Sequence, residues 1–337
     1  MKFSTFFQNW LYASNGYYET YKAIGKNGDF FTAVSSSSFF GGTIGKKIVD
    51  TIKSGFLNKD TTILEIGAHH GYLLADIIQF IFTLEPNLIK TLKFAIVEKH
   101  QNLQIKQKEY FKQSFGDEIE LIHYNSLDEV KLDSAYVVAN EIFDAFACEL
   151  VYTKNDVINI GVVNDFKLTW QKLEDEKLLN HCKKYNIVKG EVGLGYDSFA
   201  KELKRAIKKF EFITFDYGDR YPRNDFSIRI YSHHKVYPYF EDGLDIKELY
   251  QKSDITYDVH FNYLIDCFEE VDIKHTYYGT QLKALVEFGI IELLEILQKN
   301  SSEEVYLREL TKAKTLLEPI GMGERFKCAI FRKEDDK

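Results

Sequence analysis

Short apolar runs recur along the chain between stretches in which apolar residues are spaced three or four positions apart. This alternation is typical of an α/β protein, in which buried parallel strands are connected by covering helices. The apolar runs predict strands over residues 63–66, 92–97, 120–123, 135–139, 212–215 and 326–331. Helical spacing predicts a helix from residue 72 and others over residues 102–115, 171–185, 199–209 and 279–297, while residues 157–170 alternate like an antiparallel hairpin.

The strand predicted at residues 63–66 runs directly into a turn that contains two glycines and precedes a helix. The turn reads Glu65-Ile66-Gly67-Ala68-His69-His70-Gly71 and resembles the E/D-x-G-x-G-x-G loop of class I S-adenosylmethionine (SAM) methyltransferases, with His69 in place of the middle glycine. In open α/β sheets a ligand binds beyond the carboxyl ends of the strands, where glycines let the backbone come close. Glu65, Gly67 and Gly71 are therefore candidate cofactor-binding residues, and an ordinary tight turn is the alternative.

Polar residues also follow the next two predicted strands. Glu98 ends the strand at residues 92–97, where a carboxylate can accept hydrogen bonds from both hydroxyls of a ribose. Ser126 follows the strand at residues 120–123, at a position that often meets an adenine ring in such folds. Both are candidate cofactor contacts, and the alternatives are a solvated strand end for Glu98 and a plain turn for Ser126.

The fourth strand, at residues 135–139, leads into candidate catalytic residues. Asn140 and Glu141 follow it directly, and Asp144 comes three residues later, a spacing that brings its side chain near Glu141 in a helical turn. Two carboxylates could hold a guanidinium through bidentate hydrogen bonds and direct one nitrogen at a methyl group. The alternative for Asp144 is that it only favours a helix start through its charge.

Composition narrows the class of protein. The 337 residues are 45% apolar and carry a formal net charge of −8, which suits a protein with a sizeable core and disfavours non-specific binding to nucleic acid. No cysteine or histidine spacing indicates a metal site, and the four widely separated cysteines are expected to be reduced thiols. Neither a signal peptide nor an apolar run of about 18 residues is found. We therefore expect a cytoplasmic protein without membrane insertion.

The segment before the glycine turn, residues 16–50, is rich in glycine and contains a run of four serines. This composition predicts a loop followed by a helix from about residue 37. The segment could lie over the cofactor site as a lid, and a flexible entry loop is the alternative.

Several motifs, in their order along the chain, together resemble the MidA-type SAM-dependent methyltransferases. These are relatives of a mitochondrial complex I assembly factor that methylates a protein arginine. The resemblance spans most of the chain. The motifs that carry it are Gly16-Tyr17-Tyr18; Gly28-Asp29-Phe30 with Thr32, Ser37, Phe40 and Gly41; the turn from Glu65 to Gly71; Val97-Glu98 with Leu103 and Gln107; Asn140-Glu141 to Asp144-Ala145; Asp216-Tyr217-Gly218; Arg229 to Tyr231; Asp254-Ile255-Thr256 with Val259 and Phe261; and Met322-Gly323 with Phe326-Lys327.

The resemblance implies a Rossmann-like, seven-strand, mostly parallel methyltransferase sheet with family-specific insertions, SAM as cofactor and a protein arginine as acceptor. It also implies cofactor contacts from Gly28, Asp29 and Thr32. A subunit of respiratory complex I is the protein substrate that it suggests, while the oligomeric state stays open, with a homodimer as one option. Along the chain we expect a cap at residues 1–50, the core at residues 51–150 and 211–337, an insertion with helices at residues 151–210, and an acceptor-side elaboration at about residues 219–280.

Three positions depart from the pattern of the family. His69 replaces the middle glycine, Val34-Ser35 replaces a proline-glutamate pair, and Ala147 stands where a proline is usual. These departures leave two alternatives to an active protein methyltransferase. One is a homologue without catalysis that serves as an assembly or scaffold protein for a respiratory complex, and the other is an RNA methyltransferase.

Overall fold

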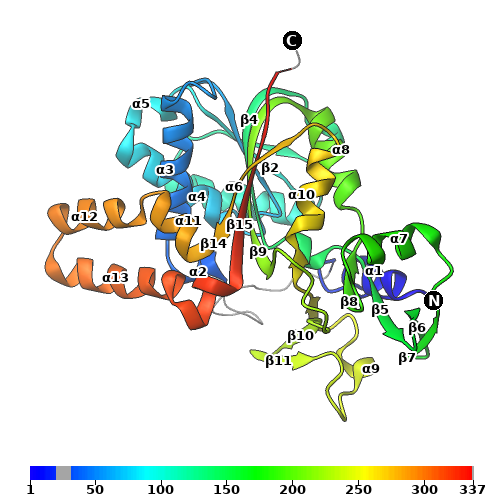
Figure 1. Cartoon of the computed structure of the whole chain (residues 1–337). Helices are drawn as coiled ribbons and strands as arrows, with labels where there is room; N and C mark the ends of the chain where they lie inside the picture. The colour runs from blue at the N-terminus through cyan, green and yellow to red at the C-terminus, as the bar shows by residue number, and fades with distance from the viewer. Residues whose placement is uncertain (20–31, 336–337) are drawn as a thin grey trace. The chain divides into compact units, whose positions relative to one another are not determined.

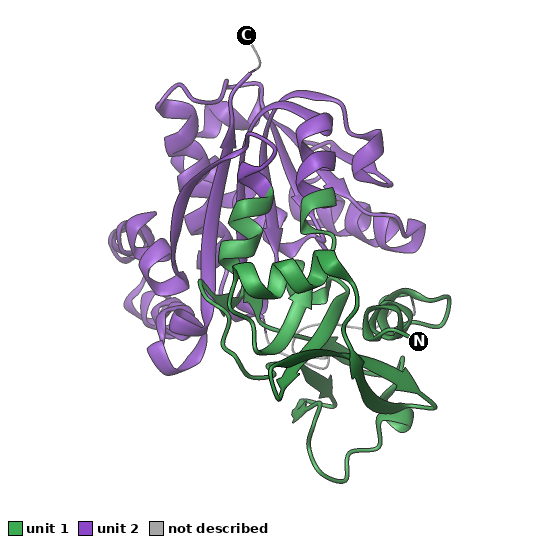
Figure 2. Cartoon of the chain, turned by 45° about the vertical axis from the view of Figure 1, so that its right-hand side comes forward, with its two compact units in different colours: residues 1–31, 142–198, 216–267 green, residues 32–141, 199–215, 268–337 purple. Residues whose placement is uncertain are grey.

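The structure is a computed structural model that describes residues 1–19 and 32–335 (Figure 1). The chain forms two compact units, each assembled from three separate segments (Figure 2). We call them the sheet unit, with residues 32–141, 199–215 and 268–337, and the insertion unit, with residues 1–31, 142–198 and 216–267, in both cases as far as these are described. Residues far apart in the sequence are thereby brought together within each unit.

The sheet unit is built on one sheet with the strand order β14-β15-β9-β4-β1-β2-β3. Neighbouring strands from β9 to β3 pair in parallel, whereas β14 and β15 pair antiparallel. The mostly parallel sheet predicted from the sequence is thereby confirmed. To the seven strands of this order an eighth is added, β13 (Val259–His260), which pairs with the end of β9. Its strands are β1 (Thr62–Ile66), β2 (Lys93–Val97), β3 (Leu121–Tyr124), β4 (Leu132–Asn140), β9 (Ile207–Asp219), β14 (Lys274–Thr280) and β15 (Phe326–Lys333), and the last four residues of β9 belong to the insertion unit.

The helices of the sheet unit are α2 (Ala33–Ser36), α3 (Phe39–Lys53), α4 (Tyr72–Leu84), α5 (Pro86–Ile89), α6 (Gln101–Phe115), most of α8 (Tyr196–Ala206), α11 (Gln281–Glu287), α12 (Ile290–Asn300) and α13 (Glu303–Leu317). Successive strand residues point to opposite faces of the sheet, so each strand contributes to two apolar layers. Ile63, Phe94 and Val138 share one buried cluster with residues of α3, α4, α11, α12 and α13. Phe212 of β9 stacks instead on the ring of Phe268. Within residues 1–19 and 32–335, no helix combines the length and apolar character needed to cross a bilayer.

The insertion unit contains two small antiparallel sheets and an aromatic core. Phe3, Phe7 and Trp10 of α1 are buried in this core, and the Trp10 indole N–H donates a hydrogen bond to the Ser253 carbonyl at 2.7 Å. The predicted hairpin at residues 157–170 is confirmed as β6 and β7. The sheets have the orders β7-β6-β5-β8 and β11-β10-β12. The elements are α1 (Phe3–Tyr12), β5 (Cys148–Lys154), β6 (Val157–Asn164), β7 (Lys167–Lys172), α7 (Glu176–Lys184), β8 (Lys189–Gly193), β10 (Arg229–Ser232), β11 (Lys235–Pro238), α9 (Ile246–Leu249), β12 (Asp254–Thr256), β13 (Val259–His260) and α10 (Phe261–Glu269).

The start of the helix predicted over residues 171–185 is wrong. Lys172 still belongs to β7, and α7 begins only at Glu176. The Asp175 side chain accepts a hydrogen bond from the backbone N–H of Leu178 at 3.1 Å and so caps the helix there. The capping residue, rather than apolar spacing, sets this boundary.

Two other helix predictions need correction at their ends. The helix predicted over residues 199–209 is α8, which begins three residues earlier and ends at Ala206, where β9 starts. The helix predicted over residues 279–297 is two helices, because Gly289 takes a left-handed conformation with φ of +97° between α11 and α12. The elements that were not predicted from the sequence are α1, α2, α5, α9, α10, α13, β5, β8, β10, β11, β12, β13 and β14.

Gly218 permits a close approach of two backbone segments, and we expect its replacement to be costly. It has φ of +144°, and a Cβ there would lie 2.1 Å from the Val259 carbonyl oxygen of the paired strand β13. Gly218→Ala should lower the free energy of unfolding by about 3 kcal/mol, because the backbone must move. Gly55 is the matched control, since its φ is +79° but, apart from its two chain neighbours, no atom of the described residues lies within 4 Å of the added Cβ. Gly55→Ala should cost only about 1 kcal/mol in urea denaturation, and equal losses in the two variants would contradict the packing argument.

Candidate functional site

The carboxyl ends of three neighbouring strands place polar residues in register at one edge of the sheet. Ile66 at the end of β1 pairs with Val97 of β2 on one side and with Ala139 of β4 on the other. The residues that follow are Glu98 and Asn140, on either side of the glycine turn after β1. Because paired strands lie about 4.8 Å apart, three groups of predicted site residues meet at this edge.

The turn after β1 has a left-handed backbone at three positions, with φ of +75° at Gly67, +47° at His69 and +78° at Gly71. At Gly71 an added Cβ would also lie 3.1 Å from the Phe111 ring, so glycine is required there for two reasons. Gly67 is exposed, which leaves its backbone open to a ligand. The two glycines predicted from the sequence thus shape the turn as expected.

A buried glutamine supports this turn from α6. The Gln107 side-chain amide donates to the His69 carbonyl oxygen at 2.7 Å, and its own oxygen lies 2.7 Å from Nε2 of His123 on β3. Burial lowers the pKa of His123 to about 4, so the imidazole is neutral at pH 7. The roles of Gln107 and His123 were not predicted from the sequence. A signal was present, since Gln107 lies one helical turn before the buried Phe111 and shares its apolar face.

The His69 side chain engages its neighbours in the chain. Its ring meets that of His70 edge-to-face, with the centroids 4.1 Å apart, and the His70 ring stacks on Tyr72 at 5.2 Å. Burial is the main cause that lowers the pKa of His70. The departure from glycine at position 69 is therefore accommodated without loss of the strand–turn–helix arrangement.

Glu65 serves the start of α4. Its side chain is 3% exposed, and its Oε2 accepts a hydrogen bond from the backbone N–H of Leu74 at 3.2 Å. Gly71 at the helix start has no side chain for capping, so Glu65 supplies an acceptor from the preceding strand. Burial raises the pKa of Glu65 to about 8. Its part in cofactor binding stays a prediction.

Glu98 ends β2 as predicted and is mostly buried, with 9% of its surface exposed. Its Oε1 accepts a hydrogen bond from the backbone N–H of His100 at 2.8 Å, which fixes the direction of the carboxylate. Burial is the largest cause of the raised pKa of this group. The Gln104 amide donates to the Glu98 carbonyl at 2.6 Å and to Asn125 Oδ1 at 3.1 Å, and so ties the ends of β2 and β3 together. Ser126, one residue further, is exposed beside this bridge.

Asn140 and Glu141 end β4 in a strained backbone. Glu141 has φ of +54°, which is uncommon for a residue other than glycine and concentrates at functional sites. Its backbone N–H donates to the Phe215 carbonyl of β9 at 2.8 Å, so the strain is imposed by sheet pairing. Asn140 Nδ2 donates to Glu141 Oε1 at 2.8 Å. The two polar side chains therefore act as a pair.

Asp144 lies in the short 3-10 turn Phe143–Ala145 of the insertion unit, whereas Asn140 and Glu141 belong to the sheet unit. Its side chain is 4% exposed. The Asp216 carboxylate holds the backbone N–H groups of Phe143 and Asp144. The approach of Asp144 to Glu141 therefore stays a prediction from their spacing.

The predicted contacts before the sheet can be placed only in part. Gly28 and Asp29 lie outside the described residues. Thr32 caps α2 and forms a reciprocal capping box with Ser35, in which Thr32 Oγ1 accepts from the Ser35 N–H at 3.2 Å and Ser35 Oγ accepts from the Thr32 N–H at 3.0 Å. The helix expected from about residue 37 is confirmed as α3.

The raised pKa of Glu65 predicts a dependence of stability on pH. The folded state holds this proton up to about pH 8, whereas the unfolded chain releases it near the ordinary value of 4.5. Its stabilisation is therefore complete below the ordinary value and is lost as the pH rises toward 8. Glu65→Gln keeps an acceptor for Leu74 and should flatten the fall in the free energy of unfolding between pH 5 and pH 8, by up to about 1.4 kcal/mol per pH unit. Urea denaturation across this range measures the change.

The exposed Glu118 provides the control for that series. Glu118→Gln should keep the slope of the wild type. Asp76, whose pKa burial raises to about 7, contributes a slope of the same sign in all three proteins. A Glu65→Gln variant as steep as the wild type would show that Glu65 is ionised in the folded state at neutral pH.

Comparisons with known proteins bear on both the family and the fold of the chain. A family model described as "putative S-adenosyl-L-methionine-dependent methyltransferase" matches residues 43–278. A crystal structure of a candidate methyl transferase from Burkholderia thailandensis, bound to S-adenosyl-homocysteine (SAH), is 19% identical with a TM-score of 0.84, and the match covers 100% of this chain and 89% of that one. A native crystal structure of an uncharacterized protein from the same organism is 20% identical with a TM-score of 0.82, covering 100% and 88%. No curated protein matches the sequence significantly.

At such identities the two crystal structures establish the fold, and the fold class predicted from the sequence is confirmed. The family match covers well over half of the chain, and it confirms the predicted cofactor and type of enzyme. The chain belongs to this family of SAM-dependent methyltransferases.

Proposed function

We propose that this methyltransferase transfers a methyl group from SAM to an arginine side chain of a protein. The observation that carries the proposal is the Asn140-Glu141 pair. Asn140 Nδ2 holds Glu141, while Asn140 Oδ1 is a buried acceptor that has no hydrogen-bond partner among the described residues. A buried acceptor is costly unless a donor reaches it. A guanidinium carries five N–H donors and suits both this oxygen and the neighbouring carboxylate.

The cofactor side of the proposal rests on Glu98 and the glycine turn. When bound, SAM supplies a methyl group on a positively charged sulfur that is already reactive toward a nitrogen. Glu98 Oε1 is fixed by His100, and the carboxylate can accept hydrogen bonds from ribose hydroxyls without donating any. Gly67 offers an exposed backbone next to it. These groups fit the cofactor of the family.

On the acceptor side, Glu141 orients the guanidinium and takes up the proton that the methylated nitrogen releases. Asp144 supplies a second carboxylate in this proposal, on the strength of its spacing along the chain. A planar fork of two hydrogen bonds fixes the direction of the nitrogen better than a single contact would. The chain therefore contributes mainly orientation to the reaction.

A subunit of respiratory complex I is the acceptor protein that we propose, and the resemblance of the motifs to the MidA-type enzymes supports it. The formal net charge of −8 favours a protein over RNA, because a phosphate backbone is repelled by excess negative charge.

Removal of the Glu98 carboxylate should weaken cofactor binding. Hydrogen bonds to a charged group contribute about 1.5–3 kcal/mol, so Glu98→Ala should raise the Kd of SAH roughly ten- to hundredfold in titration calorimetry. Glu118→Ala removes an exposed carboxylate and should leave the Kd unchanged. An unchanged Kd in Glu98→Ala would refute the ribose contact.

Purified protein, labelled SAM and a lysate of cells that lack the protein test the acceptor directly. We expect label on an arginine of a respiratory-complex subunit. Glu141→Gln should lower the rate of transfer by at least roughly tenfold at saturating SAM, because orientation of the nitrogen is lost while the cofactor contacts remain. Glu120→Gln, at an exposed position, is the matched control. Label on RNA, or on a residue other than arginine, would overturn the proposal.

A further inference from the structure

Asp216 joins two segments of the insertion unit that are 73 residues apart in the sequence. Its side chain is fully buried. Oδ2 accepts hydrogen bonds from the backbone N–H of Phe143 at 2.8 Å and of Asp144 at 3.3 Å, and Oδ1 accepts one from the N–H of Tyr217 at 2.8 Å. One carboxylate therefore holds the 3-10 turn with one oxygen and its own strand with the other.

The backbone of Asp144 is fixed on both sides. Its N–H is held by Asp216, and its carbonyl oxygen accepts a hydrogen bond from the N–H of Tyr257 at 3.3 Å. With both backbone groups engaged, the direction of the Cα–Cβ bond is set, and only side-chain rotation remains. Because Asp144 is one of the predicted catalytic carboxylates, the two hydrogen bonds determine where its carboxylate can reach.

The segment Asp216-Tyr217-Gly218 is itself held at each residue. The guanidinium carbon of Arg229 lies 4.7 Å from the centre of the Tyr217 ring, within the range of a cation–π contact. Gly218 pairs with Val259 of β13. Because the segment that carries Asp216 is held in this way, the Asp216 carboxylate stays in place. The turn Phe143–Ala145, from whose backbone N–H groups it accepts hydrogen bonds, is therefore held in place as well.

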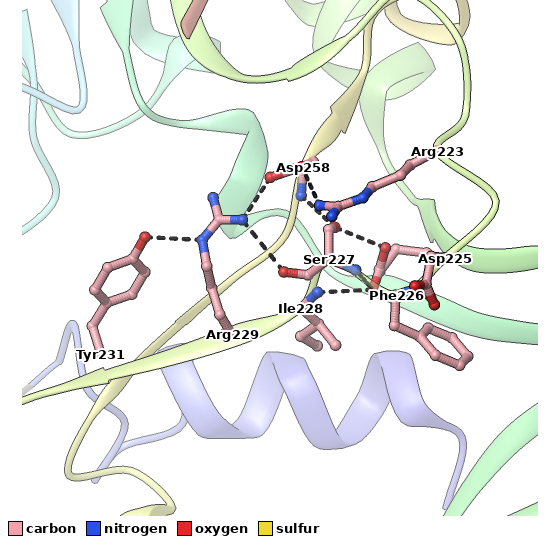
Figure 3. Close-up of polar contacts among 9 residues, drawn as sticks. Arg223, Asp225, Phe226, Ser227, Ile228, Arg229, Tyr231 and Asp258 are labelled. Atoms are coloured by element: carbon pink, nitrogen blue, oxygen red, sulfur yellow. Dashed lines mark hydrogen bonds and ion pairs between the residues drawn. The ribbon is translucent and has the colours of Figure 1, made fainter. Parts of the chain in front are cut away.

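Arg229 is in turn held by several polar contacts (Figure 3). Its Nε donates to the Tyr231 hydroxyl at 2.9 Å, and its Nη1 donates to Asp258 Oδ1 at 2.6 Å and to the Ser227 carbonyl at 3.3 Å. The arginine side chain is 9% exposed, and its charge is paired with that of Asp258. The guanidinium of this partly buried ion pair lies over the Tyr217 ring.

We propose that Asp216 is a positioning residue for methyl transfer, because it fixes the turn that directs the Asp144 carboxylate. This inference rests on the proposed function, in which Asp144 contacts the acceptor. Asparagine cannot take over the role, since an amide accepts at one end and donates at the other. In one orientation the asparagine NH2 group would face the N–H groups of Phe143 and Asp144, and in the other it would face the N–H of Tyr217. In both cases a donor faces a donor.

The test compares the wild type with Asp216→Asn, Asp144→Asn and the double variant, using SAH calorimetry and the transfer rate at saturating SAM and acceptor. Asp216→Asn should bind SAH within about twofold of the wild type while its kcat falls roughly ten- to hundredfold. Combined with Asp144→Asn, it should lower kcat no further, because it acts through Asp144. Hydrogen exchange of the segment Phe143–Ala145 should be faster in Asp216→Asn, since its backbone N–H groups lose their acceptor.

Asp219→Asn is the matched control, because Asp219 lies on the same strand and is exposed. Within the described residues, its side chain accepts a hydrogen bond from the backbone N–H of its neighbour Arg220 at 2.7 Å and from no other residue. It should leave the rate and the exchange unchanged. Equal loss in Asp219→Asn, full activity in Asp144→Asn, or a further loss in the double variant would overturn the inference.

Should Asp216→Asn fail to bind SAH, the milder Arg229→Lys takes its place. Lysine keeps a charge for Asp258 but loses the planar contact with Tyr217. Arg229→Lys should lower kcat roughly threefold in the otherwise wild-type protein. In a protein that already carries Asp144→Asn, it should leave kcat unchanged. Label on a residue other than arginine would refute the proposed function. The rates of the same variants could then be compared on that other acceptor, and they would decide the role of Asp216 independently.

Discussion

The parallel register of β1 with β2 and β4 is the constraint on which the site depends. Since Ile66 pairs with Val97 and Ala139, the residues after these strands emerge at one level. The hydrogen bonds between the paired strands align the backbones, so the side chains at the strand ends are brought close together without the help of a loop. The Rossmann-like arrangement thereby converts three separate strand ends into one edge that holds the glycine turn, Glu98 and Asn140.

Burial of polar groups at this edge sets its electrostatics. Glu65 and Asp76 are held away from water, and burial raises the pKa of each into the neutral range, so neither contributes a full charge near the turn. The neutral His123 supports Gln107 without adding a charge. A positively charged ligand at this edge would therefore interact mainly with two carboxylates, the mostly buried one of Glu98 and the partly exposed one of Glu141.

Short stretches of sequence were enough to predict those elements whose residue types are set by burial or by a left-handed backbone. The strand at residues 63–66, its glycines and the helix after it were predictable because burial and left-handed backbone select particular residue types. The same holds for Glu98, whose position follows from the end of an apolar run. The break at Gly289 was not predicted, since apolar spacing continues on both sides of it and conceals the end of one helix and the start of the next.

Long-range partners were beyond such reasoning. Gln107 and His69 are 38 residues apart, and Asp216 and Phe143 are 73 residues apart, so no window of sequence contains both members of either pair. Asp216 could be recognised as an acid in a strand, but its backbone partners carry no side-chain signature. What it holds becomes visible only when the chain is folded.

The departures from the family pattern at positions 69 and 35 change side chains while the backbone hydrogen bonds persist. Gln107 holds the carbonyl oxygen of His69, a contact that glycine would make equally well. Ser35 accepts from the N–H of Thr32 as a glutamate at the third helical position would, so α2 keeps its reciprocal cap without the negative charge. Each exchange alters what the turn presents to a ligand, an imidazole in one case and a hydroxyl in the other, and leaves the path of the chain in place.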